Sequence, residues 1–379
     1  MSQRCVVVGA GVLGAALAVE LAAAGTAVTV IDAGQPAGGA TGSTFAWIGA
    51  SHPGLSLSAE YLQLNLRGVA AHRRWAQLWG DRGWFRRTGA LTWHTDATAQ
   101  EHMADHVQEL RGMSYPAEML NPRRAVDRLE PALRVAPSVD AVAWFPDEGY
   151  ALGRPMVGDM LSVAASLGAE IRTGCEITGL RHTQNRVVGV DLADGGSVDA
   201  DSVVLACGSR TPTMLDLAGA SPVPVVSPEG DGSLAVGMLV ITSPLPRPLT
   251  RVVVVDELMM RPDGGGRLML HRDAEDRLVL ATTPIAPPPD AARELLREAG
   301  KYIDGTMMAA VESTRIGIRP VATDFLPVLG WAGGVEGVYM LLTHSGVTLA
   351  AAVAEMATAE ITGGPDQPLF TPFRPQRFT

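Results

Sequence analysis

Residues 4–32 read RCVVVGAGVLGAALAVELAAAGTAVTVID, an apolar stretch that is broken by glycines in a fixed pattern. A membrane-spanning helix needs about 20 apolar residues without such breaks, and a signal peptide needs a basic start, a short apolar core and a small-residue cleavage site. Here Glu20 lies inside the run, and four glycines interrupt it: Gly9, Gly11, Gly14 and Gly25. The pattern favours the start of a nucleotide-binding fold over a membrane span or a signal peptide.

The same stretch predicts a βαβ unit. Arg4 to Val8 and Ala27 to Asp32 have the apolar composition of short buried strands, and the Ala- and Leu-rich segment from Val12 to Ala24 is typical of a helix. A G-x-G-x-x-G sequence at a strand-to-helix turn of such a unit is the fingerprint of dinucleotide binding. We therefore expect a dinucleotide site at this turn.

Each residue of the fingerprint meets a physical requirement. Gly9 allows the tight turn, Gly11 leaves room for a pyrophosphate, and Gly14 lets the helix approach the strand. The N-terminus of the helix offers free N–H groups to the phosphates. Asp32, at the end of the second strand, can accept hydrogen bonds from a ribose diol. The three glycines alone do not distinguish a nicotinamide cofactor from a flavin.

Length and charge narrow the class of protein. With 379 residues the chain is longer than a usual single domain, which favours two domains. It has 30 Lys and Arg against 40 Asp and Glu, a net charge of −10, which argues against nucleic acid as a partner. Its three cysteines show neither metal-ligand spacing nor the even count of a disulfide framework: Cys5, Cys175 and Cys207. We expect a cytoplasmic protein with no metal site and no membrane span.

The order of the predicted elements favours two domains that interrupt each other. A Gly-, Ser- and Thr-rich loop follows the βαβ unit, and a helix is predicted from about Ala59 to Leu78. From Gly153 the pattern predicts a helix, a strand and a hairpin that belong to the first domain, whereas Pro222 to Thr283 has alternating strands typical of a separate, mainly antiparallel sheet. The predicted fold class is α/β, with a doubly wound domain and a second, mainly antiparallel domain.

A longer pattern carries a resemblance to a known family. G-x-G-x-x-G-x-x-x-A-x-x-L-A-x-x-G is completed by Ala18, Leu21, Ala22 and Gly25. This resembles FAD-binding proteins of the D-amino acid oxidase and glycine or sarcosine oxidase family. Six further motifs follow in the family's order: GSTFAWIGASH at 42–52, WFRRTGALTWHTD at 84–96, GAEIRTGCEITGL at 168–180, DADSVVLACGSRT at 199–211, GIRPVATDFLPVLG with THSGVTLA at 317–330 and 343–350, and PFRPQRF at 372–378.

The resemblance implies an FAD-binding (Rossmann-like) domain formed by residues 1–82, 147–222 and 315–379, and a substrate domain formed by 83–146 and 223–314. It also implies that FAD is bound by the fingerprint and by the later motifs. The cofactor-binding residues that it implies are Gly9, Gly11, Val12, Leu13, Gly14, Asp32, Ala33, Ser43, Thr44, Glu176, Ile177, Ala206, Cys207, Gly208, Gly330, Ser345, Gly346, Val347 and Thr348.

Two departures from the family bear on how FAD is held. The family often has Gly-His-x-Gly-x-Gly where this chain has residues 343–348, THSGVT, so two glycine positions are filled. Some relatives attach FAD through a cysteine before the GxRP motif or through a histidine near the N-terminal Ser-Thr pair. This chain has no cysteine in VESTRIGIRP, and Phe45 and Ala46 follow the pair. We expect FAD to be bound without a covalent link.

Three residues are candidate catalytic groups: Arg319, His52 and His344. The resemblance implies that Arg319 of GxRP grips a substrate carboxylate with its planar fork, although an arginine before a proline could equally hold the turn. His52 could approach flavin or substrate, or serve as a local hydrogen-bonding residue. His344 matches a family position, where a role in shaping the loop is favoured over proton abstraction. His271 could line the pocket or face solvent.

The activity implied by the resemblance is oxidation of a C–N bond in a small amine or amino acid to an imine, by hydride transfer to flavin N5, with oxygen as the final electron acceptor. Two alternatives stay open. One is a dehydrogenase of an amino or 2-hydroxy acid that passes electrons to a quinone or carrier. The other is a flavin-binding subunit of a larger complex.

Overall fold

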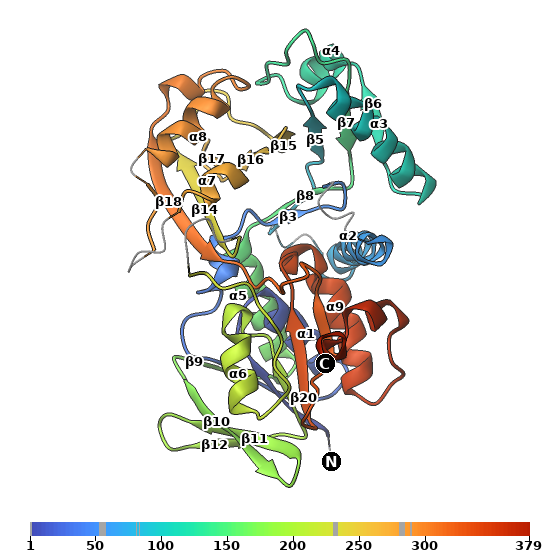
Figure 1. Cartoon of the computed structure of the whole chain (residues 1–379), viewed down its shortest axis with the longest axis vertical. Helices are drawn as coiled ribbons and strands as arrows, with labels where there is room; N and C mark the ends of the chain where they lie inside the picture. The colour runs from blue at the N-terminus through green and yellow to red at the C-terminus, as the bar shows by residue number, and fades with distance from the viewer. Residues whose placement is uncertain are drawn as a thin grey trace.

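Two large β-sheets organise the chain, the six-stranded sheet in the lower part of Figure 1 and the eight-stranded sheet in the upper part. Both termini lie in the lower part. The computed structural model describes residues 2–52, 58–80, 82, 84–229, 234–279, 285–288 and 290–379.

The six-stranded sheet has the order β19-β20-β13-β1-β2-β9. Neighbouring strands are parallel except for β19 and β20. The strands in chain order are β1 (Arg4–Val8), β2 (Ala27–Asp32), β9 (Glu170–Thr173), β13 (Ser202–Leu205), β19 (Val328–Trp331) and β20 (Val338–Leu342).

Both faces of this sheet are covered, which explains why β1 is a continuous apolar run rather than an alternating one. Cys5 and Val7 belong to a core shared with the helices, whereas Val6 and Val8 belong to a core on the opposite face. The helices that share the first core are α1 (Val12–Ala23), α2 (Ala59–Trp79), α5 (Gly153–Ser166) and α9 (Gly346–Ile361). The second core is covered by α6 (Thr211–Leu217) and by a meander of β10 (Ile177–Thr183), β11 (Arg186–Leu192) and β12 (Ser197–Asp199).

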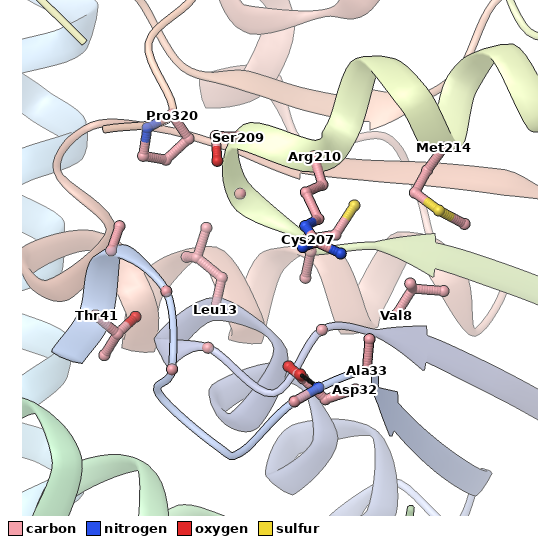
Figure 2. A pocket seen from close by; sticks show the side chains of 18 of the residues that line it. Val8, Leu13, Asp32, Ala33, Thr41, Cys207, Ser209, Arg210, Met214 and Pro320 are labelled. Carbon is pink, nitrogen blue, oxygen red and sulfur yellow. Dashed lines mark hydrogen bonds between the residues drawn. The ribbon is translucent and has the colours of Figure 1, made fainter. Parts of the chain in front are cut away.

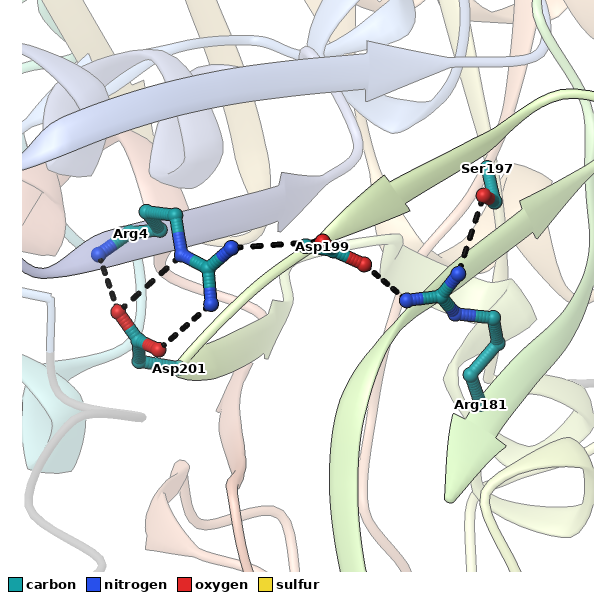
Figure 3. A network of polar contacts seen from close by, with 5 residues as sticks. All are labelled: Arg4, Arg181, Ser197, Asp199 and Asp201. Atoms are coloured by element: carbon teal, nitrogen blue, oxygen red, sulfur yellow. Dashed lines mark hydrogen bonds and ion pairs between the residues drawn. The ribbon is translucent and has the colours of Figure 1, made fainter. Parts of the chain in front are cut away.

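A surface network of charges joins β1 to this meander (Figure 3). The Arg4 guanidinium lies 3.0 Å from Asp201 and 3.5 Å from Asp199, and Asp199 also pairs with Arg181. Arg181 in turn donates to the Ser197 hydroxyl at 3.1 Å. About half of the Arg4 side chain is exposed, so these pairs contribute little to stability.

The eight-stranded sheet has the order β18-β14-β17-β16-β15-β5-β7-β6 and is antiparallel except between β15 and β5. Its strands are β5 (Ala90–Trp93), β6 (Glu118–Leu120), β7 (Val142–Phe145), β14 (Val236–Thr242), β15 (Val252–Val255), β16 (Leu258–Pro262), β17 (Leu268–His271) and β18 (Val311–Ile318). The helices of this part are α3 (Ala97–Gly112), α4 (Pro122–Arg124), α7 (Asp273–Asp276) and α8 (Ala291–Ala299).

A small sheet of β3 (Trp47–Ile48), β8 (Gly149–Ala151) and β4 (Phe85–Arg86), in the order β3-β8-β4, lies between the two large ones. Short 3₁₀ turns occur at Ala40–Ser43, Gly208–Arg210, Thr306–Met308, Pro368–Phe373 and Pro375–Phe378, and one π-helical turn at Ala125–Leu129.

The predicted α/β fold with a second, mainly antiparallel sheet is confirmed. The predicted strands of the βαβ unit coincide with β1 and β2. The helix between them ends at Ala23, one residue before its predicted end. Residues 230–233 and 280–283 of the predicted antiparallel stretch lie outside the described residues. The domain boundaries stay a prediction, and β18 crosses the one placed at residue 315. No helix in the described part of the chain is both long enough and apolar enough to cross a bilayer.

Candidate functional site

The turn between β1 and α1 can be built only from glycine at two positions. Gly9 has φ +105°, and a Cβ there would lie 2.6 Å from the carbonyl oxygen of Ala206 on the neighbouring strand. A Cβ on Gly14 would lie 2.0 Å from the carbonyl oxygen of Gly9. Because real Cβ contacts do not approach this closely, a side chain at either position would separate α1 from the sheet. Gly11 differs, since its nearest neighbour would be Thr41 Oγ1 at 3.4 Å, an ordinary contact.

Asp32 ends β2 beside this turn. Its Oδ2 accepts a hydrogen bond of 2.7 Å from the main-chain N–H of Ala10, and its Oδ1 accepts one of 2.8 Å from Gly34. The carboxylate is thus fixed at the end of the strand, and in Figure 2 it lies across the cavity from Cys207 and Arg210. Sequence reasoning anticipated Asp32 but not Arg210.

A cavity of about 840 Å³ lies over the turn, and Figure 2 shows part of its lining. It brings together residues that are far apart in the sequence. The predicted cofactor-binding residues that line it are Gly9, Gly11, Val12, Leu13, Asp32, Ala33, Thr44, Glu176, Ile177, Ala206, Cys207, Gly208, Gly346 and Val347. Residues that sequence reasoning missed include Thr41, whose hydroxyl accepts a hydrogen bond of 3.1 Å from the N–H of Val12.

Five predicted cofactor residues lie elsewhere. Gly14 packs beneath the turn, and Ser43, Ser345 and Thr348 line a second cavity. Gly330 is not among the described residues that line either cavity. It lies in β19 with φ +133°, and a Cβ there would meet Nη1 of Arg374 at 2.6 Å. Glycine at 330 therefore serves packing against Arg374, and its position does not support the predicted contact with the cofactor.

The N-termini of two helices border the first cavity. The N-cap residues of α1 and α9 are Gly11 and Ser345, and neither makes a side-chain hydrogen bond to the first turn of its helix. The residues next to them, Val12 and Gly346, line the cavity. Such helix ends carry partial positive charge and favour anions. With the glycine turn and Asp32, these residues fit the phosphates and the ribose of a dinucleotide.

The second cavity, of about 390 Å³, is lined by strands of the eight-stranded sheet and by the loop after the 3₁₀ turn at 40–43. All three predicted catalytic residues, Arg319, His52 and His344, line it, as does His271. We call it the substrate-side cavity. It shares lining residues with the first cavity: Ala40, Thr44, Pro320, His344 and Val347. The two cavities therefore meet at the N-terminus of α9.

Two histidines of the substrate-side cavity, His344 and His52, are held neutral at pH 7. Burial among protein atoms lowers the pKa of His344 to about 4, and the nearby Arg319, His52 and His271 lower it further. Burial likewise lowers the pKa of His52. His344 has accessible surface, but that surface faces the two cavities. A neutral imidazole can exchange hydrogen bonds with an uncharged amine without repelling a developing positive charge.

Arg319 has a partner that the sequence did not indicate. Its Nη2 forms an ion pair with Oδ2 of Asp276 and lies 3.3 Å from Nε2 of His271. His271 is buried in β17, so the prediction that it could line the pocket is confirmed and solvent exposure is wrong. The Nδ1 of His271 lies 3.1 Å from the carbonyl oxygen of Met238.

A second missed residue, Glu148, holds the loop that carries His52. Its buried carboxylate accepts hydrogen bonds from the N–H groups of Ala50 and Ser51, both at 2.9 Å, and from the indole N–H of Trp47, also at 2.9 Å. No local pattern around residues 147–150 signals this role, because the donors lie about a hundred positions earlier in the sequence.

Thr348, which fills a glycine position of the family motif, fastens the same loop to α9. Its hydroxyl donates a hydrogen bond of 2.9 Å to the carbonyl oxygen of Trp47, and lies 3.5 Å from the N–H of Gly49. The departure from the family pattern thus adds a contact between the loop and the helix end at which the two cavities meet.

Comparison with known proteins identifies the family. The profile of the family described as "DAO: FAD dependent oxidoreductase" matches residues 4–360. The chain belongs to this family. FAD is accordingly the dinucleotide for which the first cavity is built, since the family is one of FAD-dependent oxidoreductases.

Individual DAO-family proteins show how far the similarity extends. The glycine oxidase of Pseudomonas putida is 27% identical over 391 residues, covering 98% of this chain and 97% of that protein. The bifunctional protein ThiO/ThiG of Trichormus variabilis is 27% identical over 394 residues, and this chain spans only 55% of its length. The crystal structure of glycine oxidase from Geobacillus kaustophilus superimposes with a TM-score of 0.82 at 22% identity, covering 98% of both chains. Other relatives are named D-amino acid dehydrogenase.

Proposed function

We propose that the chain oxidises the C–N bond of a small amine or amino acid to an imine, with FAD as hydride acceptor and oxygen as final electron acceptor. The observation that carries this proposal is the meeting of the two cavities at His344 and Val347. A substrate in the smaller cavity would lie next to the part of the dinucleotide that reaches the N-terminus of α9.

The protein's own groups would bind and orient the substrate. The neutral imidazoles of His52 and His344 can accept a hydrogen bond from an uncharged amine, and their lowered pKa values keep them in this form at pH 7. The N-terminus of α9 would stabilise negative charge at the adjoining end of the cofactor. Phe45, Leu239 and Met259 give the cavity apolar walls that limit its water content.

An aerobic screen of amines and amino acids for peroxide release tests the proposal. A substrate that bleaches the flavin without air and yields peroxide with air supports an oxidase. If no amine or amino acid reduces the flavin, the proposed oxidation of a C–N bond is wrong.

The second candidate is a dehydrogenase that passes electrons to a quinone or carrier, which is favoured by the relatives named D-amino acid dehydrogenase. Timing the reoxidation of substrate-reduced protein separates the two. An oxidase is reoxidised rapidly by air, whereas a dehydrogenase stays reduced in air and is reoxidised by an added quinone. A chain that is inactive until a partner protein is added would instead support a flavin-binding subunit.

A further inference from the structure

The Arg319 guanidinium in the substrate-side cavity is already paired with a carboxylate of the protein itself. Asp276 binds it through Oδ2, while Oδ1 of Asp276 accepts a hydrogen bond of 2.6 Å from the main-chain N–H of Met238. Only 4% of the Asp276 side chain is exposed, against 21% of that of Arg319. A carboxylate that is buried and bonded through both oxygens is a fixed part of the site and not a loose surface contact.

The guanidinium is also held on its other sides. Its Nη2 lies 3.3 Å from Nε2 of His271, and its Nη1 donates to the carbonyl oxygen of Leu234 at 3.3 Å. It lies flat against Gly237 of β14, where an added Cβ would be 2.7 Å from Nη2. A substrate carboxylate needs two parallel N–H donors for a bidentate grip, and Nη2 is already committed to Asp276.

The charges around the cavity also disfavour the binding of a substrate carboxylate. The carboxylates that line it are Asp273 and Asp276, and the guanidinium groups are Arg277 and Arg319. The two carboxylates therefore balance the two guanidinium groups. An incoming carboxylate would approach Arg319 beside Asp276, so repulsion between the two anions would offset much of the attraction.

The arrangement also accounts for a grouping that resembles a cation site. One ligand atom each from His271, Asp273 and Asp276 lies within 4.8 Å of the others. The cation in this grouping is the Arg319 guanidinium, which contacts both His271 and Asp276.

We propose that Asp276 is a specificity-determining residue. Because Asp276 holds Arg319, the cavity prefers an amine that has no acid group on the reacting carbon, and the matching amino acid is the poorer substrate. This inference rests on the proposed oxidation of a C–N bond and names the substrate class for it.

The first test measures binding and needs no turnover. Holoenzyme is titrated with acetate, and the change in flavin absorbance gives Kd. Asp276→Asn keeps an oxygen for the Met238 N–H but removes the charge, so acetate should bind at least about tenfold more tightly. Unchanged or weaker acetate binding overturns the proposal. Asp276→Ser, which places a smaller uncharged side chain at the same position, repeats the measurement if the asparagine variant does not fold.

The matched control is Glu275→Gln. Glu275 is a buried carboxylate of the same short helix, but it pairs with Arg272, which is not among the residues that line the cavity. This control should lose stability and keep the acetate Kd. In Asp276→Asn combined with Arg319→Gln, the gain in acetate binding should disappear. A gain that survives in the double variant means that acetate is not bound by Arg319 and also overturns the proposal.

The second test compares kcat/KM for an amino acid and for the amine made by removing its carboxyl group. The wild type should prefer the amine, and Asp276→Asn should shift the ratio toward the amino acid by about tenfold. A wild type that prefers the amino acid contradicts the inference about Asp276. If neither compound nor any other amine reduces the flavin, the proposed function fails, while the acetate titration still decides the role of Asp276.

Discussion

The hydroxyl of Tyr115 donates a hydrogen bond of 2.8 Å to Oε1 of Glu148 inside the protein, where Glu148 is 0% exposed. The hydroxyl of Ser51 donates to the other oxygen at 3.0 Å. Together with the N–H groups of Trp47, Ala50 and Ser51, five donors satisfy one carboxylate. Burial raises the pKa of Glu148 to about 6, and the donors favour its charged form. Glu148, together with Thr348, therefore holds the loop that leads to His52.

Glu148→Gln should loosen that loop. The glutamine amide presents N–H groups where the carboxylate accepted hydrogen bonds, so at least one buried donor loses its partner, at a cost of about 1–3 kcal/mol in the free energy of unfolding. Because the loop carries His52 into the substrate-side cavity, KM for the substrate should rise as well. Urea unfolding of the holoenzyme and steady-state kinetics measure the two effects.

Asp147→Asn is the matched control, because Asp147 is the preceding residue and is also buried. Its carboxylate pairs with Arg73 at 2.5 Å and with Arg87, and it makes none of the described contacts with the loop. This variant should lose stability without a change in KM. An equal rise of KM in both variants would show that Glu148 acts on general stability and does not position the loop.

Gly14→Ala should impair folding, whereas Gly11→Ala should impair FAD binding. An added Cβ at Gly14 would overlap the carbonyl oxygen of Gly9, so this variant should not fold stably. At Gly11 the Cβ has ordinary contacts and projects toward the first cavity, so the apoprotein should keep its melting temperature and lose affinity for FAD. Melting of the apoproteins and FAD titration separate the two outcomes. Normal FAD binding by Gly11→Ala would mean that the pyrophosphate does not approach this residue.

Local sequence signals predicted the parts of the fold that local physics determines. β1, α1 and β2 were placed to within one residue, because hydrophobic runs and close-packed glycines act within a few positions. Gly9, Gly11 and Asp32 could be found because they lie at a strand end or a helix start, and the resemblance to the family indicated the other motif residues that line the first cavity. The contact between Gly330 and Arg374 could not be predicted, because Arg374 is 44 positions later and no local feature shows which side chain covers the glycine.

The pairs that define the substrate-side cavity could not be predicted in this way. Arg319 and Asp276 are 43 residues apart, and Glu148 is 97 residues from Ser51. Each pair is formed between segments that are far apart in the sequence, and a periodic pattern does not show which distant segments meet. The resemblance to the family indicated Arg319 as a site residue, but the partner of Arg319 is a feature of this chain's own tertiary structure.

Asp32→Ala should weaken FAD binding. The carboxylate would accept hydrogen bonds from the ribose and also fixes the turn through Ala10, and a hydrogen bond to a charged group is typically worth about 1.5–3 kcal/mol, or about ten- to 150-fold in Kd. Asp194→Ala is the control. Oδ1 of Asp194 accepts a hydrogen bond of 2.8 Å from the N–H of Gly196, as Oδ1 of Asp32 does from Gly34, but Asp194 lies in an exposed hairpin. If the two variants bind FAD equally well, Asp32 does not contact the cofactor.

FAD should be released intact when the protein is precipitated with acid. Two of the three cysteines, Cys175 and Cys207, line the first cavity, and burial raises the pKa of the Cys207 thiol to about 11. The thiol therefore stays protonated at neutral pH, and it is the thiolate that would attack a flavin. Flavin absorbance should appear in the supernatant. Yellow colour that stays in the precipitate and survives denaturant would reveal a covalent bond.

His72 should make the protein sensitive to mild acid. Its side chain is 0% exposed, and its Nε2 lies 2.7 Å from the carbonyl oxygen of Val347, a residue that lines both cavities. Burial lowers the pKa of His72 from 6.5 to about 4. Between these values the unfolded chain binds a proton that the folded chain does not, so stability is complete above pH 6.5 and falls as the pH drops toward 4. The shift corresponds to about 3 kcal/mol.

Urea unfolding at pH 7 and at pH 4.5 measures this loss. In His72→Gln the side chain at position 72 does not titrate in this range. The variant should therefore be less stable than the wild type at pH 7, but its free energy of unfolding should fall less on acidification. His182→Gln, at an exposed position of β10, should keep the full pH dependence of the wild type. His344 also has a pKa of about 4, so some acid sensitivity should persist in every variant. If His72→Gln and the wild type lose the same stability between pH 7 and 4.5, His72 carries a proton in the folded state and the hydrogen bond to Val347 is donated by a charged imidazole.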